Sequence, residues 1–383
     1  MGIKEDTLRL HKKHRGKIEV KSKVRLKNRY DLSLAYTPGV AVACEEIVRN
    51  RKRLYDYTAK GSSVAIVTDG SAVLGLGDIG PEAALPVMEG KAVLFKLLAN
   101  IDAYPLCLAT KDPKEIIRVV KFIAPGFSGI NLEDIASPSC FGVEEELRKE
   151  LSIPVFHDDQ HGTAVVVWAG LLNALKIVGK KKGNLRIVIN GAGAGGIAVA
   201  KFLLNLRVGN VILCDRKGTI YEGRPYHMNK YKRRIAKIIN KKREKGNLKD
   251  VIRGADIFIG LSVGRAVTKS MVRSMANDPI VFAMANPIPE IMPKDALESG
   301  ARVVATGRSD FPNQINNVLA FPGIFKGALN VRAPKITEKM ELAASQAIAS
   351  CIKSCQLKEN YIIPNPLNPE VVPRVVRAVA KVA

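Results

Sequence analysis

A glycine-rich turn between a strand and a helix constrains this chain most. The run 185–189 is apolar and β-branched like a buried strand, and the sequence Gly191-Ala-Gly193-Ala-Gly-Gly196 follows it. An apolar helical pattern, 197–206, comes next. In this setting the glycines allow a tight turn whose backbone approaches a pyrophosphate at the helix N-terminus. The motif predicts a dinucleotide-binding unit in which Gly191, Gly193 and Gly196 contact the cofactor.

An acidic residue ends the next expected strand, 210–214. Asp215 lies 24 positions after Gly191, a spacing that suits a carboxylate accepting a hydrogen bond from a ribose hydroxyl. The same carboxylate would repel the 2′-phosphate of NADP, whereas Arg216 and Lys217, which follow directly, could pair with that phosphate if they turned toward it. We therefore expect a preference for NAD with measurable use of NADP.

Short apolar runs alternate with helical patterns along most of the 383 residues. The strand-like runs are 63–68, 104–109, 129–132 and 153–157 before a long apolar helical pattern, 163–178, and 185–189, 210–214, 257–260 and 280–283 after it. Such alternation is typical of parallel sheets with helices on their faces. The length suits two domains, so we expect a two-domain α/β fold.

Acidic residues occur in pairs directly after two of these runs. Glu133 and Asp134 follow 129–132, and Asp158 and Asp159 follow 153–157. Ligand sites of open α/β sheets lie at the carboxyl ends of the strands. Clustered carboxylates suit a hard divalent cation, Mg²⁺ or Mn²⁺, although helix capping and surface roles are the alternative.

The second acidic pair lies in the sequence His157-Asp-Asp-Gln-His161, which resembles the HExxH pattern of zinc proteases. That pattern needs a helix and a glutamate base, whereas here a strand-like run precedes it and Asp replaces Glu. We therefore assign His157 and His161 structural or supporting roles.

The chain is strongly basic, with 60 Lys and Arg against 36 acids and a net charge of +24. The charge concentrates in 1–30 and 230–253, but the second segment has a single aromatic residue, Tyr231, so we do not expect specific nucleic-acid binding. A solvated helix face explains it more simply. No apolar run has the length of a signal peptide or a membrane span, so we expect a soluble cytoplasmic protein.

The six cysteines form no CxxC pair, which argues against a zinc ribbon or a disulfide framework. Cys351 and Cys355 lie four positions apart in the Ala-rich segment 343–355. We expect a helix there, with both thiols on one face and used in core packing.

Taken as a set, the segments resemble one family, the malic enzymes of the small prokaryotic type. The similarity extends from about residue 10 to the last helix and is carried by DLSLAYTPGVA (31–41), TDGSAVLGLGDIGPEA (68–83), PVMEGKAVLFK (86–96), GINLEDI (129–135), IPVFHDDQHGTA (153–164), INGAGAGGIA (189–198), CDRKGTIYEGR (214–224), ANPIPEI (285–291) and TGRSDFPNQINNVLAFPGIFKGAL (306–329).

The resemblance implies oxidative decarboxylation of L-malate to pyruvate and CO₂ with a nicotinamide cofactor and a divalent metal. Lys91 matches the family's catalytic lysine, which would accept the C2 hydroxyl proton and for which we expect a lowered pKa. Asp158 matches its neighbour. Tyr36 matches the tyrosine that would protonate C3 of the enol intermediate.

The resemblance also implies the binding residues. Glu133, Asp134 and Asp159 match the metal ligands. Asn286 and Asn317 match the family's substrate-binding amides, and we place Asn286 at the cofactor as well.

From the resemblance we further expect an N-terminal substrate and metal domain over 1–158, a Rossmann-type doubly wound domain over 159–383, a return of 318–383 to the first domain, and a homodimer. Three departures stand out: Ala72 where larger members carry a substrate-binding arginine, Arg265 in an expected turn, and the basic stretch 230–253. The alternatives are a malolactic-type enzyme that releases lactate and a basic NAD- or nucleic-acid-binding protein.

Overall fold

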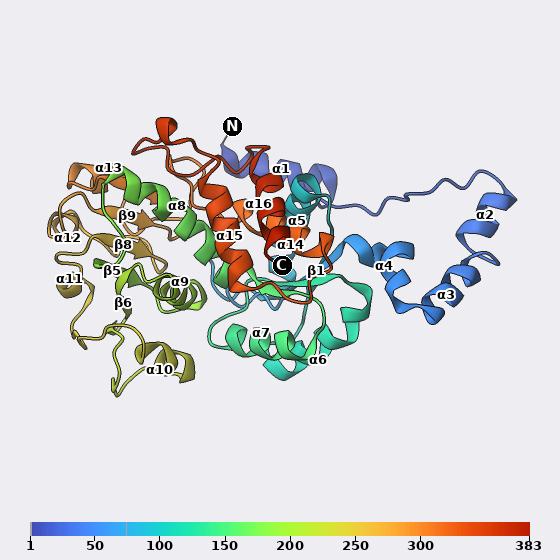
Figure 1. The fold of residues 1–383 in the computed structure, drawn as a ribbon, viewed down its shortest axis with the longest axis horizontal. Coiled ribbons are helices and arrows are strands. Elements are labelled where there is room, and N and C mark those ends of the chain that lie inside the picture. Colours follow the sequence, from blue (N-terminus) through green and yellow to red (C-terminus); the bar gives the residue numbers. More distant parts are fainter. Residues whose placement is uncertain (1, 74) are drawn as a thin grey trace.

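The chain forms two parallel sheets with helices on their faces in a computed structural model that describes residues 2–73 and 75–383 (Figure 1). The first sheet has the order β2-β1-β3-β4, with β1 Ser63–Thr68, β2 Asp102–Cys107, β3 Gly129–Leu132 and β4 Val155–His157. Every residue of β1, β3 and β4 is buried, as expected where helices cover both faces of a parallel sheet.

The second sheet has the order β10-β9-β8-β5-β6-β7. Its strands are β5 Leu185–Asn190, β6 Gly209–Asp215, β7 Gly218–Thr219, β8 Ile257–Gly260, β9 Ile280–Ala283 and β10 Val303–Thr306, and only the β6–β7 pair is antiparallel. The first strand, β5, has β6 on one side and β8 on the other. The strand order therefore reverses beside β5, and open α/β sheets bind ligands at such a point.

The helices before β4 are α1 Ile3–His14, α2 Arg29–Ala35, α3 Val40–Arg49, η1 Arg51–Arg53, α4 Leu54–Tyr57, η2 Ala59–Ser62, α5 Gly80–Ala99, α6 Pro113–Ile123, η3 Ala124–Gly126 and α7 Ser139–Glu150. After β4 follow a single π-helical turn, η4 Asp158–Gly162, and then α8 Thr163–Ile177, α9 Ala194–Asn205, α10 Lys230–Ala236, α11 Leu248–Val251, α12 Lys269–Arg273, α13 Pro293–Glu298, η5 Asn317–Leu319, α14 Phe321–Asn330, α15 Glu338–Ala349, η6 Ser354–Gln356 and α16 Val371–Lys381.

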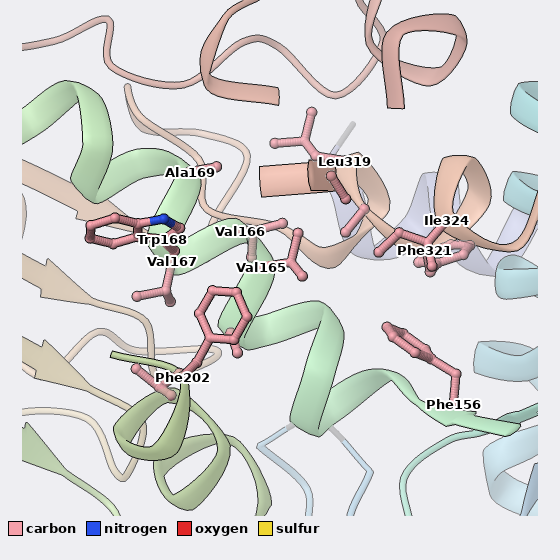
Figure 2. Close-up of a cluster of buried hydrophobic side chains, with 14 of the residues drawn as sticks. Phe156, Val165, Val166, Val167, Trp168, Ala169, Phe202, Leu319, Phe321 and Ile324 are labelled. Carbon is pink, nitrogen blue, oxygen red and sulfur yellow. The ribbon is translucent and has the colours of Figure 1, made fainter. Parts of the chain in front are cut away.

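Helix α8 joins the two sheets and is buried on nearly all sides. Figure 2 shows its valines, among them Val166, between Phe202 of α9 and the C-terminal segment that carries Phe321, with Phe156 of β4 nearby. A helix that is apolar all round belongs in the interior rather than at a surface. One continuous core therefore spans both sheets.

The end of the chain returns to the first sheet. Helix α14 lies on α5, where the ring centroids of Phe95 and Phe321 are 4.7 Å apart and those of Phe95 and Phe325 are 5.4 Å apart. Phe325 also lies over Gly129 at the start of β3, where a Cβ atom would approach its ring to 3.0 Å. The division of the chain at residues 158 and 159 stays a prediction.

Several expectations about elements need correction. Strand β2 begins and ends two residues earlier than expected, in the register set by pairing of Ser63 with Asp102. Strand β4 begins at Val155, two residues later than expected, and strands β7 and β10 were not expected. The helix expected over 343–355 ends at Ala349, since the side chains of Ser350 and Cys351 both bond to the Ala347 carbonyl, and such bonds compete with the helical ladder.

Cys351 is consequently half-buried and Cys355 is exposed, rather than both lining one helical face. None of the helices in the described part of the chain has the length and apolarity needed to cross a membrane.

Candidate active site

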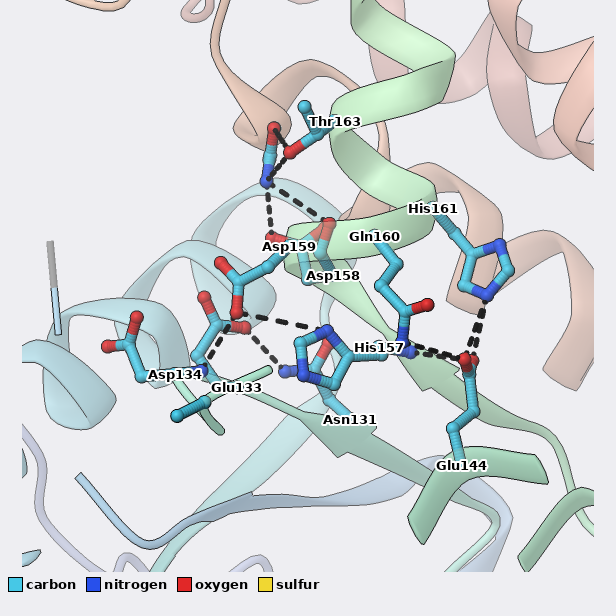
Figure 3. Close-up of polar contacts among 12 residues, drawn as sticks. Asn131, Glu133, Asp134, Glu144, His157, Asp158, Asp159, Gln160, His161 and Thr163 are labelled. Carbon is cyan, nitrogen blue, oxygen red and sulfur yellow. Dashed lines mark hydrogen bonds and ion pairs between the residues drawn. The ribbon is translucent and has the colours of Figure 1, made fainter. Parts of the chain in front are cut away.

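The two acidic pairs meet at the carboxyl ends of neighbouring strands. Strands β3 and β4 are paired in parallel with Leu132 opposite His157, so the residues that follow them emerge side by side. Figure 3 shows Glu133, Asp134 and Asp159 gathered at this edge. The structure therefore brings the acids together at one edge of the sheet, and a shared ligand site there stays a prediction.

Three of these carboxylates form a compact oxygen cluster. One oxygen each from Glu133, Asp134 and Asp159 lies within 4.8 Å of the other two. The backbone N–H of Asp134 donates to Asp159 Oδ2 at 2.9 Å, and Asp134 holds a left-handed backbone with φ of 53°. Asp tolerates this conformation better than most residues do. At Asp134 the conformation accompanies the hydrogen bond that links the segment after β3 to the segment after β4.

Electrostatics at Glu133 favour a cation. Burial raises the pKa of Glu133 well above its usual range, the ammonium of Lys91 opposes that rise, and the neighbouring aspartates add to it. Its Oε2 accepts from the Asn131 amide at 2.9 Å. An all-oxygen donor set under this repulsion fits a hard divalent cation such as Mg²⁺ or Mn²⁺.

Lys91 projects from the middle of α5 into the acids. Its Nζ lies 2.9 Å from Glu133 Oε1, donates to Asp158 Oδ2, and stands 4.1 Å from the centroid of the Phe321 ring. Burial alone would lower the pKa of Lys91, but the carboxylates of Asp158 and Glu133 outweigh it and raise the pKa above its ordinary value. The expected lowering is therefore wrong for the chain by itself, because two buried anions face this single cation.

Asp158 is fully buried and is held from the far end of the sequence. The side-chain amide of Asn317 donates to Asp158 Oδ2 at 3.2 Å and to its backbone carbonyl at 3.3 Å. The other carboxylate oxygen, Oδ1, has no hydrogen-bond partner among the described residues and lies against Gly162, where any Cβ atom would overlap it. One carboxylate oxygen of Asp158 therefore accepts from Lys91, and the other accepts no hydrogen bond from the described residues.

A second polar network supports the turn from behind. The Nε2 atom of His161 lies 2.9 Å from Glu144, and its Nδ1 atom lies 2.9 Å from Glu341 of α15. Burial acts to lower the pKa of His161, but these two carboxylates raise it to about 10. Glu144 also accepts from the backbone N–H of His157 and from the side chain of Gln160 (Figure 3).

His161 therefore ties the acidic turn to α7 and α15, whereas the side chain of His157 makes no such bond to any described residue. The ring of His157 is buried, with Nδ1 3.8 Å from Asp159 Oδ2, too far for a hydrogen bond. The turn itself is π-helical rather than the regular helix that a zinc-protease motif requires. Single π-helical turns are frequent at functional sites.

The glycine motif forms the turn between β5 and α9. Gly191 has φ of +117° and lies so close to the Leu261 carbonyl that a side chain would collide with it, and Gly196 lies equally close to the Gly191 carbonyl. A Cβ atom on Gly193, by contrast, would meet nothing within 4 Å. Gly193 caps α9 without a side-chain hydrogen bond, so the first N–H groups of this 12-residue helix are open to an anion.

The cofactor turn and the metal cluster are neighbours. A Cβ atom on Gly195, in the first turn of α9, would lie 3.2 Å from the Asp159 carbonyl oxygen. A dinucleotide on α9 would therefore lie beside the acids.

Family models match both halves of the chain. The model described as malic enzyme, NAD binding domain, matches residues 160–383, which is more than half of the sequence, and the model described as malic enzyme, N-terminal domain, matches residues 15–115. This chain belongs to the malic enzyme family. As such it is a nicotinamide-dependent oxidoreductase with a Rossmann-type domain, and the recognition of the family from its sequence motifs is confirmed.

Individual malic enzymes match along nearly the whole chain. The bifunctional malic/malolactic enzyme of Bacillus subtilis is 60% identical over 383 residues, which are 100% of this chain and 93% of that protein. The NAD-dependent malic enzyme of Geobacillus stearothermophilus is 58% identical over 96% of this chain and 77% of its own. The crystal structure of the NAD-dependent malic enzyme of Thermotoga maritima gives a TM-score of 0.94 at 49% identity and covers 98% of this chain and 99% of that one.

In this malic enzyme the acid at the end of β6 is not free. Asp215 accepts from Arg224 at 2.9 Å, from Lys232 Nζ at 2.6 Å and from the backbone N–H of Lys217 at 2.9 Å. Burial acts to raise the pKa of Asp215, but these donors outweigh it and lower the pKa. The carboxylate expected to repel a 2′-phosphate is thus already paired with two cations, and Arg216 and Lys217 are exposed beside it.

Tyr36 is not at the active site of its own chain. It follows α2 and is 68% exposed, and Figure 1 shows α2 and α3 standing clear of the two sheets. The fold brings Lys91 and the acids together, as the sequence motifs predict. It does not bring Tyr36 to them within one chain.

Asn286 lies in the exposed loop after β9, where its backbone carbonyl oxygen abuts Gly75, between β1 and α5, and its side-chain amide faces Gly307. The backbone N–H of Ala72, also between β1 and α5, donates to the Asp134 carbonyl at 2.9 Å. Arg265 occupies the expected turn with φ of 62° and is exposed.

The basic stretch 230–253 is partly an ion-paired surface. Besides Lys232 with Asp215, Arg234 pairs with Glu145 at 2.7 Å, and Arg243 pairs with Glu222 at 2.9 Å. These pairs favour the expectation of a solvated face.

Sequence reasoning missed the partners of the site residues. No role was predicted for the ring of Phe321 near Lys91, for the two cations that pair with Asp215, or for the two carboxylates that pair with His161. The two cations are Arg224 and Lys232, and the two carboxylates are Glu144 and Glu341. Phe321 and Arg224 lie inside motifs that carry the family resemblance, which was the only signal available for them. The glutamates sit in ordinary helical patterns that predict nothing about a histidine elsewhere.

Proposed function

We propose that this malic enzyme converts L-malate to pyruvate and CO₂ with reduction of NAD or NADP, and that it requires Mg²⁺ or Mn²⁺. The observation that carries the proposal is the buried contact of Lys91 with Asp158 and Glu133 beside a three-carboxylate cluster, next to an open helix N-terminus. The reaction needs a proton acceptor, a metal-binding group and a cofactor-binding turn close together, and these contacts support that assignment.

Glu133, Asp134 and Asp159 would hold the metal ion. When bound, a divalent cation supplies Lewis-acid polarisation of the substrate oxygens and stabilisation of the enolate formed on loss of CO₂. A nicotinamide cofactor held at the glycine turn before α9 would supply the acceptor for the hydride that leaves C2.

Lys91 would accept the C2 hydroxyl proton, for which it must first be neutral. Its own proton can pass along the hydrogen bond to Asp158 Oδ2, where a carboxylate can accept it. The hydrogen bond from Asn317 would keep the Asp158 carboxylate oriented toward Lys91. The Phe321 ring makes a cation–π contact with the Lys91 ammonium. Asp158 thus acts as the proton partner of Lys91, and the pair can return the proton in the second half of the reaction.

The enol intermediate then needs a proton at C3, and Tyr36 would donate it. Atoms balance: malate loses a hydride to the cofactor and CO₂ to solution, and the hydroxyl proton taken from C2 replaces the one given at C3. Asn286 and Asn317, from the second half of the chain, would bind the substrate carboxylate.

For the cofactor we propose NAD as the preferred substrate, with measurable use of NADP. Asp215 can still accept from a ribose hydroxyl, but Arg224 and Lys232 compensate its charge, which reduces repulsion of a 2′-phosphate. We therefore expect the preference to be modest. We also propose that the enzyme works as a homodimer.

A malolactic reaction, in which bound pyruvate is reduced to lactate, is the second candidate, because the 60% identical relative from Bacillus subtilis is named bifunctional. Incubation with L-malate, Mn²⁺ and each cofactor, with pyruvate, lactate and reduced cofactor all measured, separates the two. Pyruvate with equal reduced cofactor supports the malic reaction, and lactate without net reduced cofactor supports the malolactic one. Release of neither product overturns the proposal.

A further inference from the structure

Glu290 is a buried carboxylate that takes no part in the proposed reaction. It lies in the motif 285–291 and is fully buried. Its Oε1 atom accepts from the backbone N–H of Ser262 at 3.0 Å, and its Oε2 atom accepts from the backbone N–H of Ala285 at 3.0 Å. Burial raises the pKa of Glu290, and these two bonds oppose the rise. Within the described part of the chain its donors are backbone N–H groups and the Ser262 hydroxyl, not a cation.

The two backbone donors follow neighbouring strands of the second sheet. Ser262 comes two residues after the end of β8, and Ala285 comes two residues after the end of β9. The link extends to β5, because the side-chain amide of Asn190, the last residue of that strand, donates to the Ser262 hydroxyl at 2.7 Å. These three strands are adjacent in the sheet (Figure 1). Glu290 therefore connects the carboxyl ends of three neighbouring strands.

Gly260 makes room for this carboxylate. A Cβ atom at Gly260 would lie 2.2 Å from the carboxyl carbon of Glu290, and 2.4 and 2.6 Å from its two oxygens. The backbone N–H of Val267 donates to the Glu290 carbonyl at 3.0 Å, which also fixes the main chain of this residue. A side-chain atom added at Gly260 would therefore displace the carboxylate from its donors.

The loops after β8 and β9 lie where the second half of a dinucleotide would bind. The open N-terminus of α9 after β5 suits the pyrophosphate, and Asp215 at the end of β6 suits the adenosine ribose. The rest of the cofactor would then extend to the other side of β5, across the point where the strand order reverses. Strands β8 and β9 lie on that side. The nicotinamide and its ribose would therefore lie against the loops that Glu290 joins.

We propose that Glu290 is a positioning residue for the nicotinamide half of the cofactor. It fixes the loops after β8 and β9, and with them Asn286, which directly follows Ala285. A carboxylate offers both N–H donors an anionic oxygen, which gives stronger bonds than a neutral acceptor does. In Glu290→Gln the amide has one oxygen, so its NH₂ group faces one of the two backbone donors. The inference rests on the proposed function, which assigns Asn286 to the substrate.

Binding of NAD and of ADP, measured by calorimetry without malate or metal, tests the proposal. ADP carries the adenosine and pyrophosphate of NAD but neither the second ribose nor the nicotinamide. Glu290→Gln should raise the Kd for NAD by about 10- to 100-fold, the loss expected for a hydrogen bond to a charged group. The Kd for ADP should stay close to that of wild type, because the glycine turn and Asp215 keep their positions.

A second variant displaces the carboxylate without removing it. Gly260→Ala keeps Glu290 but moves its carboxyl group, so it should weaken NAD binding in the same way and leave ADP binding unchanged. Glu298→Gln is the matched control, since Glu298 is an exposed acid of α13 that pairs with a lysine on the surface. This control should bind both nucleotides as wild type does.

Two results overturn the proposal. One is a wild-type Kd for NAD in Glu290→Gln. The other is a loss of ADP binding as large as the loss of NAD binding, because Glu290 would then support the whole cofactor-binding half of the chain. Thermal unfolding of each variant shows whether it folds.

Ser262→Ala decides the question if neither of the other variants folds. It removes only the hydroxyl between Asn190 and Glu290 and keeps the backbone donor. The Kd for NAD should then rise by about 2- to 10-fold, the loss of a neutral hydrogen bond, while the Kd for ADP stays the same. An unchanged Kd for NAD in this variant would count against the role of Glu290.

The wild-type enzyme, assayed with malate alongside, separates this inference from the proposed function. If wild type binds NAD but forms neither pyruvate nor lactate, the function is wrong, and the binding measurements still decide the role of Glu290. If wild type is active but Glu290→Gln binds NAD equally well, only the role of Glu290 is wrong.

Discussion

The side-chain amide of Asn317 donates to the buried carboxylate of Asp158 at 3.2 Å, although 159 positions separate them in the sequence. Asn317 begins η5, directly before the helix that supplies the ring beneath Lys91. The orientation of Asp158, and through it the environment of Lys91, is therefore set by the last part of the chain rather than by the strand that carries the acid.

Gly162→Ala should inactivate the enzyme without removing any functional group. The added Cβ would overlap Asp158 Oδ1, so the carboxylate must move off Lys91 and Asn317. Displacement of reacting groups by about 1 Å costs on the order of 100-fold in rate. Steady-state pyruvate formation checks this. Gly126→Ala, where a Cβ would meet nothing within 4 Å, is the control and should keep full activity. Equal rates for the two variants would show that Asp158 needs no fixed position.

Lys91→Ala should slow both hydride transfer and pyruvate release by about 10²- to 10⁴-fold, the usual contribution of a positioned acid or base. Single-turnover measurement of reduced cofactor and of pyruvate gives the two steps separately. Lys96→Ala removes an exposed lysine of the same helix, paired with Asp102, and should behave as wild type. Wild-type rates in Lys91→Ala would refute the assignment.

Activity should disappear on exhaustive chelation and return with Mn²⁺ or Mg²⁺. Asp159→Ala and Glu133→Ala should each lose both reaction steps and weaken Mn²⁺ binding measured by calorimetry, because each removes one of three clustered oxygen donors. Glu82→Ala, an exposed acid in the first turn of α5, should bind Mn²⁺ as wild type does. Full turnover by the chelated enzyme would contradict metal dependence.

The preference for NAD over NADP in kcat/KM should be less than about tenfold, or about 1.4 kcal/mol. Lys232→Ala should widen it, because Asp215 then keeps more of its charge toward a 2′-phosphate. Arg216→Ala should leave NAD use unchanged and lower NADP use at most slightly. A large NADP preference that vanishes in Arg216→Ala would show that this exposed arginine, not Asp215, decides the cofactor.

Glu144 should contribute stability that depends on pH in the acid range. Burial acts to raise its pKa, but His161 outweighs burial and lowers the pKa of Glu144 to about 2 from 4.5. Since the unfolded chain binds the proton more readily, this stability is fully present above pH 4.5 and is lost as the pH falls toward 2. Breaking a buried pair costs about 3–5 kcal/mol, so Glu144→Gln should be destabilised by that order near pH 6.

Urea unfolding of wild type and Glu144→Gln over this acid range checks the effect. The difference between them should shrink as the pH falls through the lowered pKa. Glu145→Gln, the next residue and a surface acid, is the control and should stay close to wild type. A difference that does not change with pH would mean that Glu144 acts through packing alone.

The sequence was sufficient for features that depend on neighbours along the chain. Strands β1, β3, β8 and β9 have the expected bounds, because buried parallel strands are continuous apolar runs. The acids of β3 and β4 meet because both pairs directly follow strands, and the glycine turn follows from backbone geometry at Gly191 and Gly196.

What the sequence left undetermined depends on distant partners. The pKa of Lys91 is raised, not lowered, because the fold brings two buried carboxylates to one ammonium, and Asp215 is paired because Arg224 and Lys232 fold back on it. The exposed position of Tyr36, away from Lys91 within one chain, could not be predicted from its motif, since a motif identifies a side chain but not its distance from residues elsewhere.

The return of the C-terminal segment to the first sheet also governs when the site can exist during synthesis. A nascent chain that has emerged only as far as β10 already contains both sheets, Lys91 and the two acidic pairs that follow β3 and β4. It still lacks the amide on Asp158, the ring under Lys91, and Glu341, the second carboxylate on His161. Almost the whole polypeptide must therefore leave the ribosome before Lys91, Asp158 and His161 reach their final surroundings.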